Sequence, residues 1–182
     1  MLRFFRKKQT NPAVLELYAK AVAQARQPAF YQTFGVPDTL DGRFDMIVFH
    51  LWPLIAALND GEGGITDDGQ ALFDTFVADM EGNLRSIGVS DNSFPKKMKA
   101  IGRAFYGRYA AYATAAGDEA TLATAIARNL LEDEEKAGSH EARALALYAN
   151  AMAVAVGARP LDEPFRYPEP VEFVTETLAK AS

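Results

Sequence analysis

Apolar residues recur at intervals of three and four along most of the chain, and this spacing predicts helices rather than strands. Residues that favour helix N-caps precede most of the periodic segments, as at Asn11, Thr66, Asp118 and Ser139. We therefore expect helices over about 12–25, 28–34, 39–58, 66–87, 95–115, 118–130 and 139–156. Pro53 lies inside the third, where it should kink or split the helix. The pattern predicts an all-α, single-domain, irregular bundle of about six to eight helices.

The two ends of the chain differ from this periodic middle. Residues 1–10 form a basic N-terminal tail, in which Arg3, Arg6, Lys7 and Lys8 surround apolar side chains. Such a tail suits a weak contact with an anionic bilayer, and the simpler interpretation is a frayed, solvated terminus. Residues 159–182 contain spaced prolines and form an expected extended strap with a short helix over about 171–180. The helical domain is then 11–158.

The periodicity also predicts which faces are buried. In the fourth helix the expected core stripe is Leu72, Phe73, Phe76, Val77, Met80, Leu84 and Ile87. In the fifth helix it is Met98, Ile101, Phe105, Tyr109 and Tyr112. His50 falls on the flank of the third helix, so we expect it at the surface or at the boundary of the core.

The composition of the chain limits the kinds of chemical site that it can form. The 182 residues are 49% hydrophobic and 24% charged, which is typical of one soluble globular domain. The chain has no cysteine and two histidines, so thiolate sites are excluded and a multi-histidine metal site nearly so. No stretch approaches the roughly 20 apolar residues of a membrane-spanning helix. We expect no metal and no cofactor.

One enzymatic alternative has to be considered, because helical enzymes bind magnesium diphosphate through Asp-rich motifs. The nearest matches are Asp41-x-x-x-Asp45 and Asp67–Asp68. Each lies in the first turn or turns of an expected helix, where an acid favours the helix dipole. Local capping and an ion pair with Arg43 explain the first match at least as well. We therefore do not expect an enzyme.

Charge is distributed in blocks. Residues 59–91 hold eight acids and one base, whereas residues 92–117 hold no acid and five bases. On the fifth helix, the basic stripe, defined as Lys96, Lys97, Lys99 and Arg103, lies away from the apolar face, and Tyr106 stands at its border. This stripe suits lipid head groups, RNA phosphates or an acidic protein. The alternative is a solvated face neutralised by the acidic helices of the same domain.

The segment 35–45 also has two interpretations. Gly35, Pro37 and Gly42 constrain its backbone, and Asp38, Asp41 and Arg43 are charged. It is either a rigid connector between two helices or a polar loop presented to a partner.

Three long segments resemble the ubiquinol–cytochrome c chaperone family: YQTFGVPDTLDGRFDMIVFHLWPLI, GQALFDTFVADMEGNLRSIGVSD and KKMKAIGRAFYGRYAAY. The family includes mitochondrial assembly factors of the cytochrome bc1 complex and bacterial relatives. The resemblance implies an all-α chaperone without catalytic residues that binds newly made cytochrome b. It also implies a cytoplasmic protein peripherally associated with the inner membrane. An anionic membrane surface is an expected partner, a ribosome is a further candidate, and DNA is not expected.

Two sets of residues are candidates for partner binding under this interpretation. The first is the basic stripe with Tyr106 and the charged loop residues Asp38, Asp41 and Arg43. The second is an aromatic groove for the hydrophobic client, formed by Phe30, Tyr31, Phe34, Trp52 and Phe94. The alternative function is a peripheral membrane- or RNA-binding module whose basic helix face is sufficient for binding.

Overall fold

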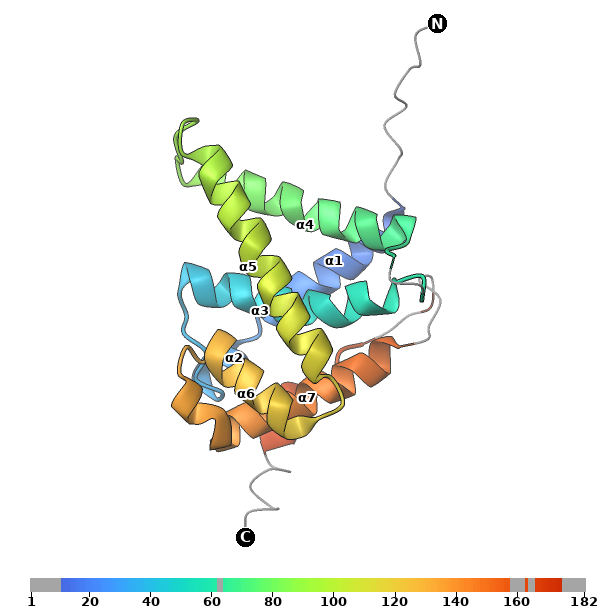
Figure 1. The fold of residues 1–182 in the computed structure, drawn as a ribbon, viewed down its shortest axis with the longest axis vertical. Coiled ribbons are helices and arrows are strands. Elements are labelled where there is room, and N and C mark those ends of the chain that lie inside the picture. Colours follow the sequence, from blue (N-terminus) through green and yellow to red (C-terminus); the bar gives the residue numbers. More distant parts are fainter. Residues whose placement is uncertain (1–10, 62–63, 158–162, 164–165, 175–182) are drawn as a thin grey trace, which may run out of the picture.

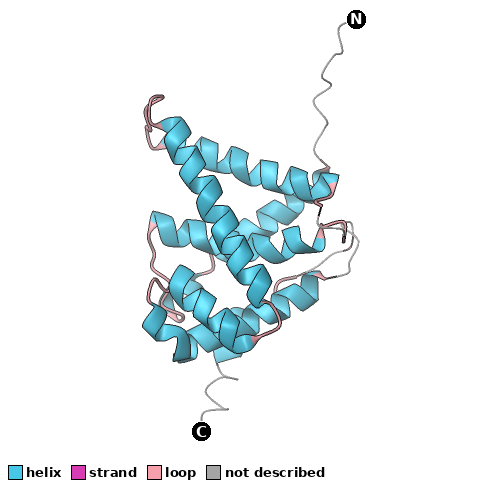
Figure 2. Cartoon of the chain, viewed as in Figure 1, coloured by secondary structure: helices cyan, strands magenta, loops and turns pink. Residues whose placement is uncertain are grey.

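The computed structural model describes residues 11–61, 64–157, 163 and 166–174, and within them the architecture is helical (Figures 1 and 2). The elements in chain order are α1 Pro12–Ala25, α2 Pro28–Gln32, α3 Leu40–Ala57, α4 Asp67–Ser86, α5 Phe94–Ala115, α6 Glu119–Asn129, the 3-10 helix η1 Glu134–Gly138 and α7 His140–Val156. The all-α class is confirmed. Part of the expected C-terminal helix is present at 170–174. Its remainder and the N-terminal tail lie outside the described residues.

Side-chain caps fix the beginnings of five helices, at the four residues named from the sequence and at Thr39. The backbone N–H of Ala13 donates to Asn11 at 3.1 Å, and that of Thr121 donates to Asp118 at 2.7 Å. Thr39, Thr66 and Ser139 cap α3, α4 and α7 in the same way. Each cap satisfies a backbone donor that the helix itself leaves unpaired.

Helix α3 is the centre of the molecule. It contacts α1, α4, α5 and α7, and Figure 1 shows α5 crossing it. Because neighbours cover it on several sides, α3 is buried continuously from Asp45 to Ile55. Pro53 does not split it, since the helix runs unbroken from Leu40 to Ala57. At its start, a Cβ on Gly42 would lie 2.0 Å from the carbonyl oxygen of Pro37, so the close approach of this loop requires glycine.

His50 is fully buried, so the prediction that it lies at the surface or at the boundary of the core is wrong. Its Nδ1 lies 2.8 Å from the carbonyl oxygen of Met46, which can only accept, so Nδ1 carries the proton. Its Nε2 therefore accepts from the Tyr148 hydroxyl at 2.9 Å, and Gln24 donates to the same hydroxyl at 3.0 Å. Burial lowers the pKa of His50 to about 4, which keeps the ring neutral near pH 7.

The segment 166–174 crosses this polar network. The Tyr167 hydroxyl donates to the backbone carbonyl of His50 at 3.0 Å, and Gln24 reaches the carbonyl of Pro168 at 3.3 Å. The Phe173 ring meets Tyr148 edge-on, with centroids 5.7 Å apart. These contacts attach the described part of the strap to α1, α3 and α7.

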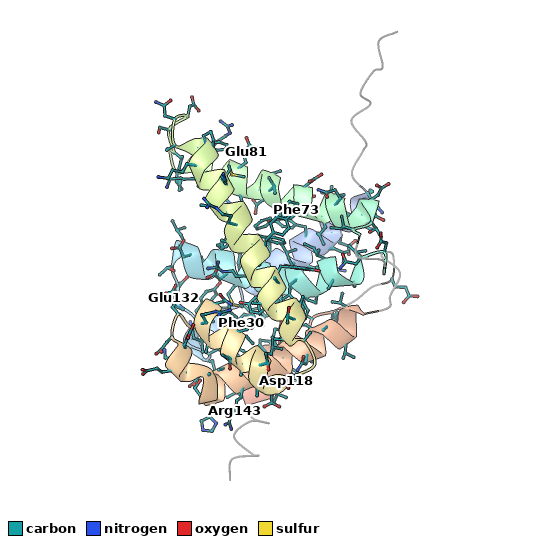
Figure 3. The ribbon with its side chains drawn as sticks, viewed as in Figure 1. Phe30, Phe73, Glu81, Asp118, Glu132 and Arg143 are labelled. Carbon is teal, nitrogen blue, oxygen red and sulfur yellow. The ribbon has the colours of Figure 1, made fainter. Side chains whose placement is uncertain are left out.

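Helices α4 and α5 form a hairpin whose tip projects from the body, at the upper left of Figure 1. Its base is closed by aromatic rings: Phe105 lies 5.0 Å from both Phe73 and Phe76, measured between centroids. Figure 3 shows Phe73 between the two helices. Phe44 of α3 joins this cluster 6.0 Å from Phe76, which ties the base of the hairpin to the central helix.

Candidate partner-binding face

Helix α5 divides into a buried and an exposed face as its periodicity predicts. Phe105 and Tyr112 are buried, and Met98, Ile101 and Tyr109 are half-buried. The helix begins at Phe94 and has prolines only at its start, so 22 residues run without interruption past the body. Its outward face is therefore one continuous helical surface.

The basic stripe lies on that outward face. Lys96, Lys97, Lys99 and Arg103 are all exposed. In the part of the chain that the structure describes, none of the four forms an ion pair; the ion pairs found there join Lys20, Arg43, Arg85 and Arg108 to acids. The described acids of this domain thus do not neutralise the stripe by direct contact. The stripe is open to an external anion.

Arg108, at the edge of the same helix, behaves differently because it turns inward. Its Nη2 donates to Oδ2 of Asp45 at 3.0 Å, and its guanidinium lies 5.6 Å from the Phe44 ring centroid. Asp45 is 2% exposed, and this burial raises its pKa to about 6 despite the opposing effect of Arg108. Arg108 therefore fastens α5 to α3 and is not part of the binding surface.

This pair also bears on the Asp41-x-x-x-Asp45 motif. Asp41 is exposed in the first turn of α3, whereas Asp45 points into the core and is held by Arg108. The two carboxylates thus have separate environments and separate structural roles. Within the described residues, no group of three or more metal-ligating side chains comes together.

Tyr106 borders the stripe as predicted. Its side chain is 59% exposed, and its ring lies 5.5 Å from Phe73 and 5.6 Å from Phe105. One side of the ring is therefore held by the hairpin base. The other side is available beside the basic residues.

The charged loop is rigid and lies at the N-terminal end of α3. Nε of Arg43 donates to Oδ1 of Asp38 at 2.6 Å on the surface, and this hydrogen bond holds the pKa of Asp38 below its usual range. Asp41 is exposed next to them. Among the described residues, the ion pair of this loop joins Arg43 to Asp38 and does not reach the basic stripe.

The predicted aromatic groove is wrong. Phe30 and Phe34 are fully buried and Trp52 is 2% exposed, so their rings fill the core and cannot line a surface groove. Phe30 packs against His50 and Tyr148 with centroids 5.1 and 5.4 Å apart. Tyr31 is half-buried and donates to the carbonyl of Ala25, and Phe94 lies far along the chain at the start of α5.

The sequence interpretation also missed the hairpin tip, which we define as residues 84–99. Ile87 was expected in the core stripe of the fourth helix, but it is 60% exposed. Its spacing fits the stripe, yet the body ends before the hairpin does, so the last turn has nothing to pack against. The adjacent basic residues were the one available signal that this end faces outward.

Comparison with known proteins places this helical chain in a family. A family model described as ubiquinol–cytochrome c chaperone matches residues 32–165, a range that includes the basic stripe and the charged loop. The chain is also similar to the crystal structure of the Cbp3 homolog from Brucella abortus, with a TM-score of 0.76, 31% identity, and coverage of 90% of this chain and 92% of that chain. No curated protein matches it. The chain belongs to the ubiquinol–cytochrome c chaperone family, whose members are assembly chaperones of the bc1 complex.

No helix in the described part of the chain combines the length and the apolar character needed to cross a bilayer.

Proposed function

We propose that this protein is a non-catalytic assembly chaperone that binds newly made cytochrome b and supports its incorporation into the bc1 complex. It acts in the cytoplasm, in peripheral contact with the inner membrane. The family match over residues 32–165 carries this proposal, because it covers α3 to α7 and both charged surfaces.

The basic stripe is the feature that suits this role physically. A chaperone for a membrane-embedded subunit has to work where lipid phosphates create a negative potential, and each basic residue near such a surface contributes about 1 kcal/mol. Four exposed cations without an ion pair among the described residues provide that attraction. A ribosome delivering the client would present phosphates of the same kind.

Client recognition is assigned to surfaces other than the aromatic core. Tyr106, beside the stripe, offers an exposed ring, and the Asp38–Arg43 pair with Asp41 offers fixed charges on a rigid loop. The buried Phe30, Phe34 and Trp52 serve the fold. We therefore place the client on the outer faces of the helices.

The alternative is a peripheral membrane- or RNA-binding module without a protein client. The same exposed stripe favours it. This alternative requires binding that falls steeply with salt and that needs no cytochrome b.

The test is a pull-down of the tagged chain from gently solubilised membranes of the native host, with mass spectrometry of the recovered proteins. We expect cytochrome b in preference to the other bc1 subunits. The Lys99→Glu and Arg103→Glu double variant should recover less, because both residues share with Tyr106 the face of α5 on which we place the client. A matched control, Arg128→Glu with Arg143→Glu, changes the net charge equally on α6 and α7 and should recover as much as the unmodified chain. Recovery of lipid or ribosomes without cytochrome b would instead support the alternative.

A further inference from the structure

The hairpin tip combines a basic surface with an exposed aliphatic side chain. Its side chains include four bases, Arg85, Lys96, Lys97 and Lys99, and one acid, Asp91. At its apex Ile87 is 60% exposed. Leu84, Val89, Phe94 and Met98 are half-buried but do not join the hydrophobic core of the described residues.

The tip is nevertheless well ordered by local contacts. The backbone N–H of Val89 donates to the carbonyl of Leu84 at 3.1 Å around Gly88, whose φ is +77°. The guanidinium of Arg85 lies 4.5 Å from the centroid of the Phe94 ring and also pairs with Glu81 at 2.8 Å. The exposed Ile87 is therefore presented by a fixed turn.

We infer that the hairpin tip docks on an anionic bilayer, with Ile87 entering the boundary between head groups and acyl chains and the basic stripe lying among the lipid phosphates. This inference rests on the proposed role at the membrane surface and specifies how that contact is made.

The dimensions of the tip suit a bilayer. Along α5, Lys96 and Arg103 are separated by about 10 Å, given the helical rise of about 1.5 Å per residue. Interfacial segments bury their apolar side chains by a similar depth of about 5–10 Å. With the tip directed at the bilayer, Lys96 and Lys97 in the first turn of α5 lie nearest the phosphates, and Arg103 lies about 10 Å farther along the helix.

The composition of the apex favours lipid over RNA. Proteins that bind single-stranded nucleic acid stack bases on exposed aromatic rings. The exposed apolar residue at the apex is the aliphatic Ile87, and one face of the aromatic Phe94 is covered by Arg85. The exposed aromatic ring of Tyr106 lies at the base of the hairpin, with one side against Phe73 and Phe105, and not at the tip. An aliphatic side chain beside cations is the arrangement of interfacial membrane anchors.

The first experiment measures sedimentation with vesicles of equal parts phosphatidylcholine and phosphatidylglycerol, and with phosphatidylcholine alone. We expect binding to the anionic vesicles. Ile87→Ser should weaken it about tenfold through loss of apolar burial. Lys96→Glu with Lys97→Glu should abolish it, since each basic residue accounts for about fivefold in partitioning.

Two matched controls separate the tip from general effects. Val154→Ser removes an aliphatic side chain that is 80% exposed on α7, and Arg128→Glu with Arg143→Glu makes the same change in net charge. Figure 3 places Arg143 at the end of the molecule away from the tip. Both controls should bind as the unmodified chain does. Circular dichroism checks that every variant is folded.

The depth of Ile87 is measured separately with Ile87→Trp and brominated lipids. The new indole should be quenched, whereas the native Trp52, which is 2% exposed, should not be. Val154→Trp should show no quenching. Unchanged vesicle binding by Ile87→Ser, or an unquenched indole in Ile87→Trp, would overturn insertion of the apex. Binding to polyuridylate RNA in place of vesicles would overturn the choice of a bilayer.

A pull-down of cytochrome b from detergent-solubilised membranes tests the proposed function independently of this inference. Ile87→Ser should recover cytochrome b normally, because detergent has removed the bilayer. If the tip binds vesicles but the protein recovers no cytochrome b, the proposed client is refuted and docking of the tip on a bilayer stands. If the protein recovers cytochrome b but the tip substitutions do not change vesicle binding, docking of the tip is refuted and the proposed client stands.

Discussion

The core around α3 and the tip of the α4–α5 hairpin use similar residues for different purposes. Around α3, aromatic rings and a histidine are completely enclosed, and every neighbouring element contributes to the packing. At the tip, apolar side chains of comparable size lie outside the core and are ordered by their own turn. Apolar periodicity therefore indicates burial only as far as neighbouring elements extend.

The largest expected difference between the two regions comes from truncating one apolar side chain in each. Phe30→Ala should lower the free energy of unfolding by about 3–5 kcal/mol, because it leaves a cavity against His50 and Tyr148. Ile87→Ala should change it by less than about 0.5 kcal/mol. Urea denaturation of both variants provides the measurement. Equal losses would show that the tip contributes to the core.

The second prediction concerns the pH dependence of stability, to which His50 and Asp45 contribute in opposite directions. The pKa of His50 falls from 6.5 to about 4 on folding, so the unfolded chain binds the proton more tightly and stability decreases as pH falls through this range. The pKa of Asp45 rises from 3.8 to about 6, so the folded chain binds its proton more tightly and stability increases as pH falls from 6 to 4. Each contribution amounts to about 3 kcal/mol, so the two largely offset each other.

Single substitutions separate these contributions. Asp45→Asn should make stability fall more steeply between pH 6.5 and 4 than in the unmodified chain. His50→Gln should make stability rise as pH falls over the same interval. Urea denaturation at a series of pH values measures both slopes. Parallel curves for all three proteins would contradict the assigned shifts.

A smaller effect is expected from the polar network. Tyr148→Phe removes the hydroxyl that donates to Nε2 of His50 and accepts from Gln24, and it leaves both groups buried without that partner. The cost should be about 1–3 kcal/mol. Tyr106→Phe is the matched control, because its hydroxyl belongs to a side chain that is 59% exposed. Similar losses in the two variants would show that the network contributes little.

These comparisons also explain how far the sequence could predict the structure. The caps at Asn11, Asp118 and Ser139 were predictable because a cap depends on residues within one turn. The contact of Asp45 with Arg108 joins residues 63 positions apart, so it could not be predicted from the local sequence around either residue.

The errors at His50 and Ile87 have opposite physical causes. Helix α3 is covered on several sides, so even the flank that carries His50 is buried. The tip extends past the body, so the position that carries Ile87 is exposed although its spacing matches the core. The basic stripe was predictable because one-sided charge on a helix depends only on spacing, whereas its lack of ion pairs depends on where α4 and α6 lie.

The smallest predicted effect tests whether a glycine in α5 lets a partner come close to the helix at a cost in the stability of the fold. Gly102 lies in the interior of α5, and a Cβ there would meet no atom within 4 Å. Gly102→Ala should therefore stabilise the fold by about 0.5–1 kcal/mol, since alanine restricts the unfolded chain and favours the helix. Gly88→Ala should have the opposite sign at about 1 kcal/mol, because φ is +77° there. If Gly102→Ala stabilises the protein in urea yet weakens vesicle binding, the open space beside the basic stripe serves a partner; if binding is unchanged, the partner does not approach α5 at that turn.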